Sequence, residues 1–156
     1  MKNLKTVLIL LVIIAFCTPA FAEDRRKALM DAVDFGVKTL ETKGKAGFVE
    51  LKAYRFSNGE GYVYVGDTDG FVLMHPLAAE LVGKDCTAIK DAKGKFFGAE
   101  MVAKAIKQGT GWTSYWWPNA KKNNTPELKC SYYRVTTMDG KKVIVYAGLY
   151  DVGNCE

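Results

Sequence analysis

The C-terminal half of the chain most constrains its fold, because three runs rich in aromatic and β-branched residues follow one another there. They are Trp112–Trp117, Leu128–Met138 and Val143–Tyr150. Such residues suit the pleated, half-buried surface of a strand. The dipeptide Asp139-Gly140 between the last two runs is typical of a tight hairpin turn. The order therefore predicts neighbouring antiparallel strands.

Two shorter runs earlier in the chain predict another hairpin. Tyr62–Val65 and Phe71–Met74 flank the sequence Asp67-Thr68-Asp69-Gly70. An Asp-x-Asp-Gly run resembles part of a calcium loop, but the third ligand and the later glutamate of an EF-hand are missing. We therefore expect a turn and no metal there.

Helical periodicity marks two other segments. From about residue 24 to residue 43, apolar residues recur at steps of three and four, which predicts a long helix with one buried stripe. Phe97–Gln108 predicts a shorter helix between strands, stopped by glycine. The segment 46–56 is ambiguous, 77–91 is expected to be mostly loop, and Pro118 is expected to end its strand.

The first residues have the pattern of an export signal. Lys2 and Lys5 precede the apolar run Val7–Phe16, and the small residues around Ala22 fit a signal-peptidase site. We predict a signal peptide over 1–22 and one domain over 23–156, placed in the periplasm or secreted. An uncleaved membrane anchor is the alternative. Loss of the two lysines lowers the formal charge from +5 to +3, too little to indicate nucleic-acid binding.

The cysteines leave several arrangements open. Cys86, Cys130 and Cys155 follow the predicted cleavage site, and a lipoprotein signal centred on Cys17 is disfavoured by the bulky residue before it. In an oxidising compartment two of the three can pair, and Cys130 with Cys155 is weakly favoured. Three buried thiols are an equal alternative. The spacing is not that of a metal site.

A single histidine, His75, stands at the end of the first hairpin. It could donate a hydrogen bond to a ligand carboxylate, or simply cap a carbonyl in a loop. One histidine argues against a zinc centre and against a Ser-His-Asp site. No nucleophile–base pair and no glycine-rich phosphate loop stands out, so we expect neither an enzyme nor a cofactor.

The strand Trp112–Trp117 is aromatic on both faces, since alternation places Tyr115 and Trp117 on one face and Trp112 on the other. Either both faces are covered, or one lines a ligand pocket. Core packing and base stacking are the alternative roles for these rings. Lys129 opens the next strand and could face either a small anion or water. Tyrosines on the predicted strands, Tyr64 among them, could orient a polar ligand.

Five motifs, in this order, resemble the single Cache family of extracytoplasmic, PAS-like sensor domains. They are Tyr62–Pro76 ending in His-Pro, Val82–Lys84 with Asp91–Lys95, Gly111–Pro118, Lys129–Tyr132, and Ala147–Tyr150. The resemblance implies an α+β fold, with an antiparallel five- to six-stranded sheet, a long N-terminal helix and a shorter helix between strands. It also implies a ligand pocket on one sheet face.

The resemblance raises the expectation that certain residues line this pocket: His75, Tyr115, Trp117, Lys129 and Tyr132, to which the strand tyrosines add Tyr64. Lys129 and Tyr132 are three residues apart, so an undistorted strand would send them to opposite faces. The expected function is an exported, non-catalytic binding domain for a short carboxylate or similar metabolite. A membrane receptor or kinase is the expected partner. The alternative is an accessory subunit of a membrane receptor whose pocket is vestigial.

Overall fold

In the computed structural model of the chain, residues 19–156 are described, with side chains from residue 22 onward. The expected signal peptide over 1–22 lies largely outside these residues. The elements, in chain order, are α1 (Pro19–Lys43), η1 (Gly44–Gly47), α2 (Phe48–Ala53), β1 (Val63–Asp67), β2 (Val72–Met74), η2 (Ala79–Leu81), η3 (Cys86–Ala88), α3 (Phe97–Gln108), β3 (Thr110–Asn119), η4 (Ala120–Lys122), β4 (Thr125–Met138) and β5 (Lys141–Tyr150).

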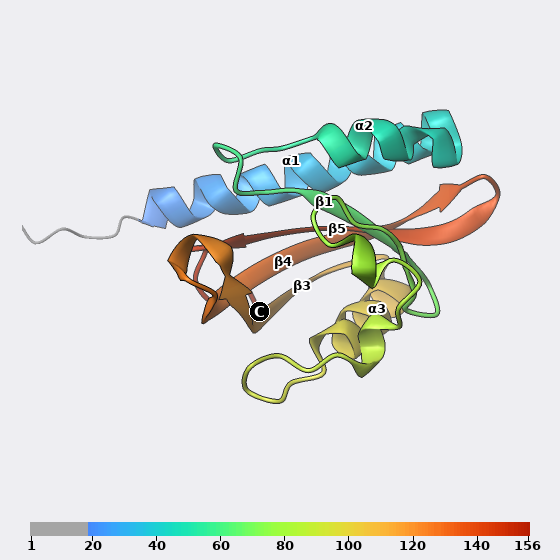
Figure 1. Cartoon of the computed structure of the whole chain (residues 1–156). Coiled ribbons are helices and arrows are strands. Elements are labelled where there is room, and N and C mark those ends of the chain that lie inside the picture. Colours follow the sequence, from blue (N-terminus) through green and yellow to red (C-terminus); the bar gives the residue numbers. More distant parts are fainter. Residues whose placement is uncertain (1–18) are drawn as a thin grey trace, which may run out of the picture.

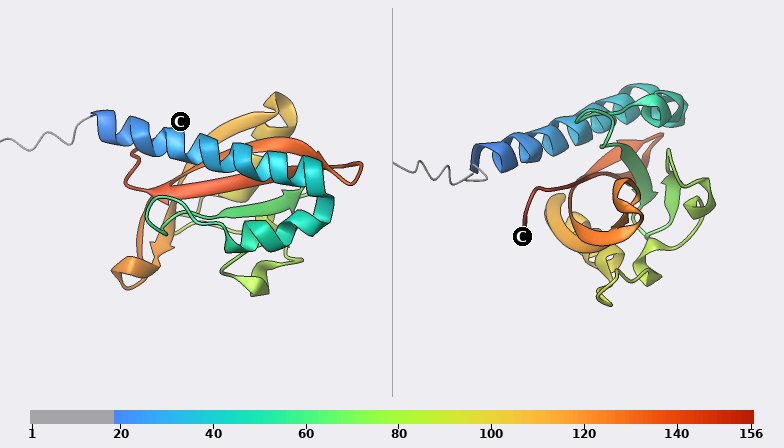
Figure 2. Two further views of the ribbon diagram at one scale, coloured as in Figure 1. Left: turned by 90° about the horizontal axis from the view of Figure 1, so that it is seen from above. Right: turned by 60° about the vertical axis from the view of Figure 1, so that its left-hand side comes forward.

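The five strands form one antiparallel sheet in the order β2-β1-β5-β4-β3. Helices α1 and α2 cover one face, while α3 and the η2–η3 segment cover the other (Figure 1, Figure 2). The expected α+β fold, with its long N-terminal helix and a shorter helix between strands, is confirmed. Within residues 19–156, no helix combines the length and apolar character needed to cross a bilayer.

The face beneath α1 holds the larger apolar core. The predicted helical stripe supplies Leu29, Val33 and Leu40, all at most 1% exposed. Helix and sheet approach most closely at Gly36, where an added Cβ would lie 2.7 Å from a methyl group of Val145. Gly36 therefore belongs to the packing stripe because only a residue without a side chain fits there.

The predicted turns form as their sequences indicate. Asp139 and Gly140 have φ values of 51° and 79°, the positive pair that a two-residue hairpin turn requires. Asp67 accepts hydrogen bonds from the backbone N–H groups of Asp69 (3.0 Å) and Phe71 (2.8 Å), so its carboxylate stabilises a turn.

The prediction that Pro118 ends its strand is wrong, because β3 continues to Asn119 and pairs Pro118 with Pro126. β3 is an edge strand. The outward backbone groups of Ser114 and Trp116 bond to Glu156, Lys95 and Asp91 instead of to another strand. Pro118 has the same parity as these residues, so its missing N–H faces outward and costs no ladder hydrogen bond.

Candidate functional site

The candidate site lies on the sheet face that α3 covers. Every second residue of each strand points to this face. Register places Lys129 of β4 directly between Tyr115 of β3 and Tyr150 of β5. The face also carries Tyr64 on β1, which pairs with Tyr146 of β5.

Lys129 is buried, with 5% of its surface exposed. Its ammonium donates a hydrogen bond to the hydroxyl of Tyr62 at 3.3 Å and lies 5.0 Å and 5.3 Å from the ring centres of Tyr62 and Tyr150. Among the described residues, no carboxylate forms an ion pair with it. The face therefore contains a desolvated cation whose only protein partners are phenols.

Desolvation lowers the pKa of Lys129, but the phenols of Tyr115, Tyr62 and Tyr150 outweigh it when they ionise, so the pKa lies above its ordinary value. Burial in turn raises the pKa of Tyr115, and it raises that of Tyr150 to about 12. These phenols are consequently neutral at pH 7. Neutral phenols lend the ammonium no negative charge at pH 7, and no carboxylate among the described residues pairs with it.

His75 ends β2 and lies beside the same tyrosines, its ring centre 5.1 Å from that of Tyr62 and 5.4 Å from that of Tyr64. Its Nδ1 accepts hydrogen bonds from the N–H groups of Leu77 (3.2 Å) and Ala78 (2.9 Å). An accepting Nδ1 requires the proton of the neutral ring to be on Nε2.

The protonation state of His75 follows from its surroundings. Burial, followed by the charge of Lys129, lowers the pKa of His75 to about 4, against a smaller opposing effect of Glu80. The ring is neutral at pH 7 and offers its Nε2–H as a donor. The two roles considered for His75 are compatible, because Nδ1 caps the loop while no described residue accepts a hydrogen bond from Nε2.

Tyr64 and Tyr115 add hydroxyl groups to this face. The hydroxyl of Tyr115 forms a 3.0 Å hydrogen bond with Ser131, the fully buried residue between Lys129 and Tyr133 on the same face. Burial raises the pKa of Tyr64 well above its ordinary value, and Tyr115 and Tyr146 add smaller effects in the same direction. Both phenols are therefore neutral and able to donate.

An aromatic wall closes one side of the site. The ring of Phe97, at the start of α3, stacks on Tyr115 with centres 4.1 Å apart and meets Trp117 edge-on at 5.2 Å. The free thiol of Cys86 packs against the same cluster, and burial raises its pKa to about 11. The Cys86 thiol is therefore protonated at pH 7 and a poor nucleophile.

The floor of the site is Gly148 of β5. A Cβ added there would lie 2.7 Å from Cε of Lys129 and 2.6 Å from Oγ of Ser131. The absence of a side chain allows the lysine stem to lie flat on the sheet. Gly148 thus fixes the place of the ammonium.

The structure brings together His75, Tyr64, Tyr115, Trp117 and Lys129, but not Tyr132. Tyr132 lies in the core beneath α1, where its ring packs 4.6 Å from that of Trp112. β4 pairs without a register shift through this region, so no bulge turns Tyr132 toward Lys129. Tyr132 therefore lies on the opposite sheet face.

The predicted site set omitted several residues that the structure adds, namely Tyr62, Phe97, Ser131 and Gly148. Tyr62 could have been found from sequence, because strand alternation places it on the face of Tyr64. Phe97 could not, because its contact with Tyr115 depends on how α3 folds back over the sheet.

No group of three or more His, Cys, Asp or Glu side chains suited to a metal is found within residues 19–156. The weakly favoured cysteine pair is confirmed, since Cys130 and Cys155 form a disulfide with Cα atoms 6.0 Å apart. Two open surface hollows of ≈ 520 and ≈ 360 Å³ include none of the candidate side chains.

Known proteins with the same architecture are sensor domains. A Cache chemosensory domain described for carboxylic acid recognition is 25% identical and has a TM-score of 0.70, covering 85% of this chain and 97% of its own. The periplasmic sensor domain of a chemotaxis protein is 26% identical, with a TM-score of 0.62 and coverages of 85% and 94%. A methyl-accepting chemotaxis protein from Vibrio parahaemolyticus shares the fold at 22% identity and a TM-score of 0.65, with the same coverages.

In sequence, the chain is 29% identical over 100 residues to the methyl-accepting chemotaxis protein McpP of Pseudomonas putida. The match covers 64% of this chain but only 18% of the relative, so the chain spans less than a fifth of that receptor. The family model for the Cache domain matches residues 48–137, which include β1 to β4 and most of the candidate site. The chain belongs to the Cache domain family.

Proposed function

We propose that this domain binds a small monocarboxylate on the α3 side of its sheet, performs no chemistry on it, and acts as an extracytoplasmic sensor or binding module. The observation that carries this proposal is the buried ammonium of Lys129, which no described carboxylate balances. A buried cation left without an anion is costly, and a bound carboxylate would relieve that cost.

The surrounding donors suit one carboxylate group. Lys129 would neutralise it, while Nε2–H of His75 and the hydroxyls of Tyr64 and Tyr115 would donate to its oxygens. Trp117 and Phe97 would shield the short carbon chain from water. Because His75 is neutral at pH 7, the site supplies one positive charge, which favours a monoanion over a dicarboxylate.

Relatives agree with this chemistry, since a Cache chemosensory domain of similar fold has been described for carboxylic acid recognition. Sensor domains of that kind belong to chemotaxis receptors, so a membrane receptor or kinase is the partner class that we propose. An export signal over 1–22 would place the domain in the periplasm or outside the cell.

A vestigial pocket is the second candidate function, with the domain acting as an accessory subunit. The rings of Tyr62 and Tyr150, with centres 5.0 Å and 5.3 Å from the ammonium, favour it because they already occupy part of the space around Lys129. Cation–π contacts of this kind compensate part of a desolvated charge.

Calorimetry separates the two candidates. Protein refolded free of carried-over ligand is titrated with acetate, propionate, pyruvate, lactate and succinate. Saturable binding of at least one monocarboxylate, with succinate weaker, supports the sensor function. No heat from any of the acids, in protein shown to be folded, refutes it and supports the vestigial pocket.

A further inference from the structure

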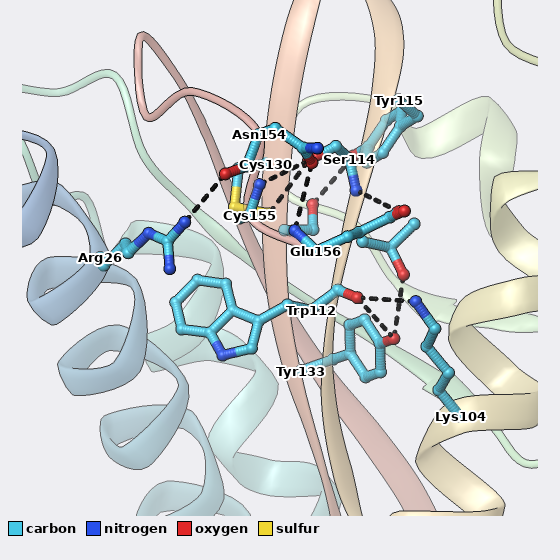
Figure 3. Close-up of a disulfide and its surroundings, with 12 residues drawn as sticks. Arg26, Lys104, Trp112, Ser114, Tyr115, Cys130, Tyr133, Asn154, Cys155 and Glu156 are labelled. Atoms are coloured by element: carbon cyan, nitrogen blue, oxygen red, sulfur yellow. Dashed lines mark hydrogen bonds between the residues drawn. A yellow bond between two sulfur atoms is a disulfide. The ribbon is translucent and has the colours of Figure 1, made fainter.

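The segment after β5, residues 151–156, is a strap across the outer strands. Asp151 and Gly153 have positive φ values of 56° and 82°. Beyond them, Asn154, Cys155 and Glu156 lie beside Ser114 of β3 (Figure 3). Cys155 is bonded to Cys130 of β4, and its backbone N–H donates to Oγ of Ser114 at 3.0 Å. The strap is thus held both covalently and by hydrogen bonds.

Glu156 connects the strap to the aromatic wall of the candidate site. Its Oε1 accepts from the N–H of Ser114 at 2.9 Å and pairs with Lys95 at 2.7 Å. Lys95 also donates to the carbonyl of Ser114 at 2.9 Å and pairs with Glu100 of α3 at 3.1 Å. The Glu156 carboxylate therefore adds the strap to the contacts that join β3 to the segment leading into α3, beside the direct bonds that Lys95 and Asp91 make to β3.

The wall begins immediately beyond these contacts. Ser114 precedes Tyr115, and Lys95 lies two residues before Phe97, whose ring stacks on Tyr115 at 4.1 Å. Cys130 directly follows Lys129 in β4. Release of the strap would remove the Cys155 and Glu156 contacts from β3 next to the residues that form the site, and would leave Asp91 and Lys95 to hold β3 against the segment that leads into α3.

We propose that docking of the strap and occupation of the site stabilise one another, so that the disulfide and Glu156 tune ligand affinity. The proposal rests on the monocarboxylate function for its ligand, while the structural coupling stands on the strap contacts alone. Coupling is reciprocal: if the docked strap favours binding, bound acid must favour the docked strap by the same factor.

The first test needs no ligand. Hydrogen exchange is compared in the full chain, in Glu156→Gln and in Asp31→Asn, a control that removes an exposed ion pair with Lys27 on α1. We expect faster exchange at Tyr115, Trp117 and the first turn of α3 in Glu156→Gln only. Equal exchange in all three proteins overturns the coupling.

The second test uses reciprocity in the wild-type protein. Reduction of the Cys130–Cys155 disulfide by dithiothreitol is trapped by alkylation and followed by the mass of the peptides that contain Cys130 and Cys155. Saturating propionate, or whichever of acetate, pyruvate and lactate binds most tightly, should slow reduction about fivefold or more. An unchanged rate overturns the proposal.

The third test measures how changes to the strap alter the affinity for the acid. Cys130→Ala combined with Cys155→Ala, and separately Glu156→Gln, should each weaken binding of that acid, while Asp31→Asn should not. Glu156→Gln decides the result if the double cysteine variant does not fold. If no acid binds the wild-type protein, the proposed function fails, and hydrogen exchange alone decides whether strap and wall are coupled.

Discussion

Replacement of Lys129 by methionine should make the empty domain more stable and abolish its affinity for acids. Methionine fills a similar volume without a charge. The substitution should raise folding stability but lower acid affinity. The buried ammonium destabilises the empty domain, whereas it supplies the main attraction for a bound acid.

The stability term follows from the contacts of Lys129. Transfer of an ammonium from water to this face costs roughly 3–5 kcal/mol. The long hydrogen bond to Tyr62 returns about 1.5 kcal/mol, and each of the two ring contacts returns about 0.5–1 kcal/mol. The midpoints of these terms leave a net gain from Lys129→Met of about 1 kcal/mol, or about 2–4 °C in Tm for a domain of this size.

The affinity term is larger. An ammonium and a carboxylate about 4 Å apart attract by about 4 kcal/mol at an effective dielectric constant of 20. Desolvation of the carboxylate cancels part of this, which leaves about 2 kcal/mol or more and a loss of about 30-fold or more in affinity.

Differential scanning calorimetry without ligand and titration calorimetry with propionate, acetate, pyruvate or lactate measure the two terms. Lys104→Met is the matched control, because Lys104 pairs with Glu100 at 2.6 Å and donates to the carbonyl of Trp112. It should lower Tm and leave acid affinity unchanged. A Lys129→Met protein that is less stable than wild type, or that binds acid as tightly, would refute the reasoning.

Three further predictions concern neighbouring residues. Because the folded-state pKa of His75 lies near 4, below its usual value of 6.5, the empty domain should lose about 1–2 kcal/mol of stability as pH falls from 6.5 to 4, after allowance for solvent screening. In urea denaturation measured at a series of pH values, His75→Gln should reduce the change in unfolding free energy between pH 6.5 and 4. Gly148→Ala should cost about 1–3 kcal/mol by overpacking and weaken acid binding, because its Cβ displaces the stem of Lys129; denaturant melts and titration calorimetry check both. Tyr115→Phe should weaken acid binding severalfold and Tyr132→Phe should not; equal affinities in these two variants would place the site elsewhere.

The sequence predicted the architecture well because its signals are local. Alternation along Trp112–Trp117, periodicity over 24–43 and the Asp139-Gly140 turn each depend on near neighbours, and the structure shows all three features. The prediction that Pro118 ends its strand was wrong because it depends on a non-local property. Whether a proline breaks a strand depends on which side of it another strand lies, and that is a property of the sheet order.

The difference between local signals and contacts of distant segments also explains which features of the site could be predicted from the sequence. Alternation alone separates Lys129 from Tyr132, and the structure places them on opposite faces. Alternation cannot show that Lys129 lacks an acidic partner, because that depends on the segments that cover the face.

The covering segments also explain how one face can serve both stability and binding. Beneath α1, the sheet is closed by apolar contacts and the disulfide. On the α3 side, the cluster around Phe97 and Tyr146 contains Tyr146 with a hydroxyl that has no hydrogen-bond partner in the described part of the chain, in addition to the unbalanced Lys129. A buried hydroxyl without a hydrogen-bond partner and a buried ammonium without a counter-ion both cost stability, and both lie on the face where a bound ligand could relieve the cost. Occupancy of the α3 side should therefore stabilise this domain, by about 2.7 kcal/mol at a ligand concentration of 100 times Kd.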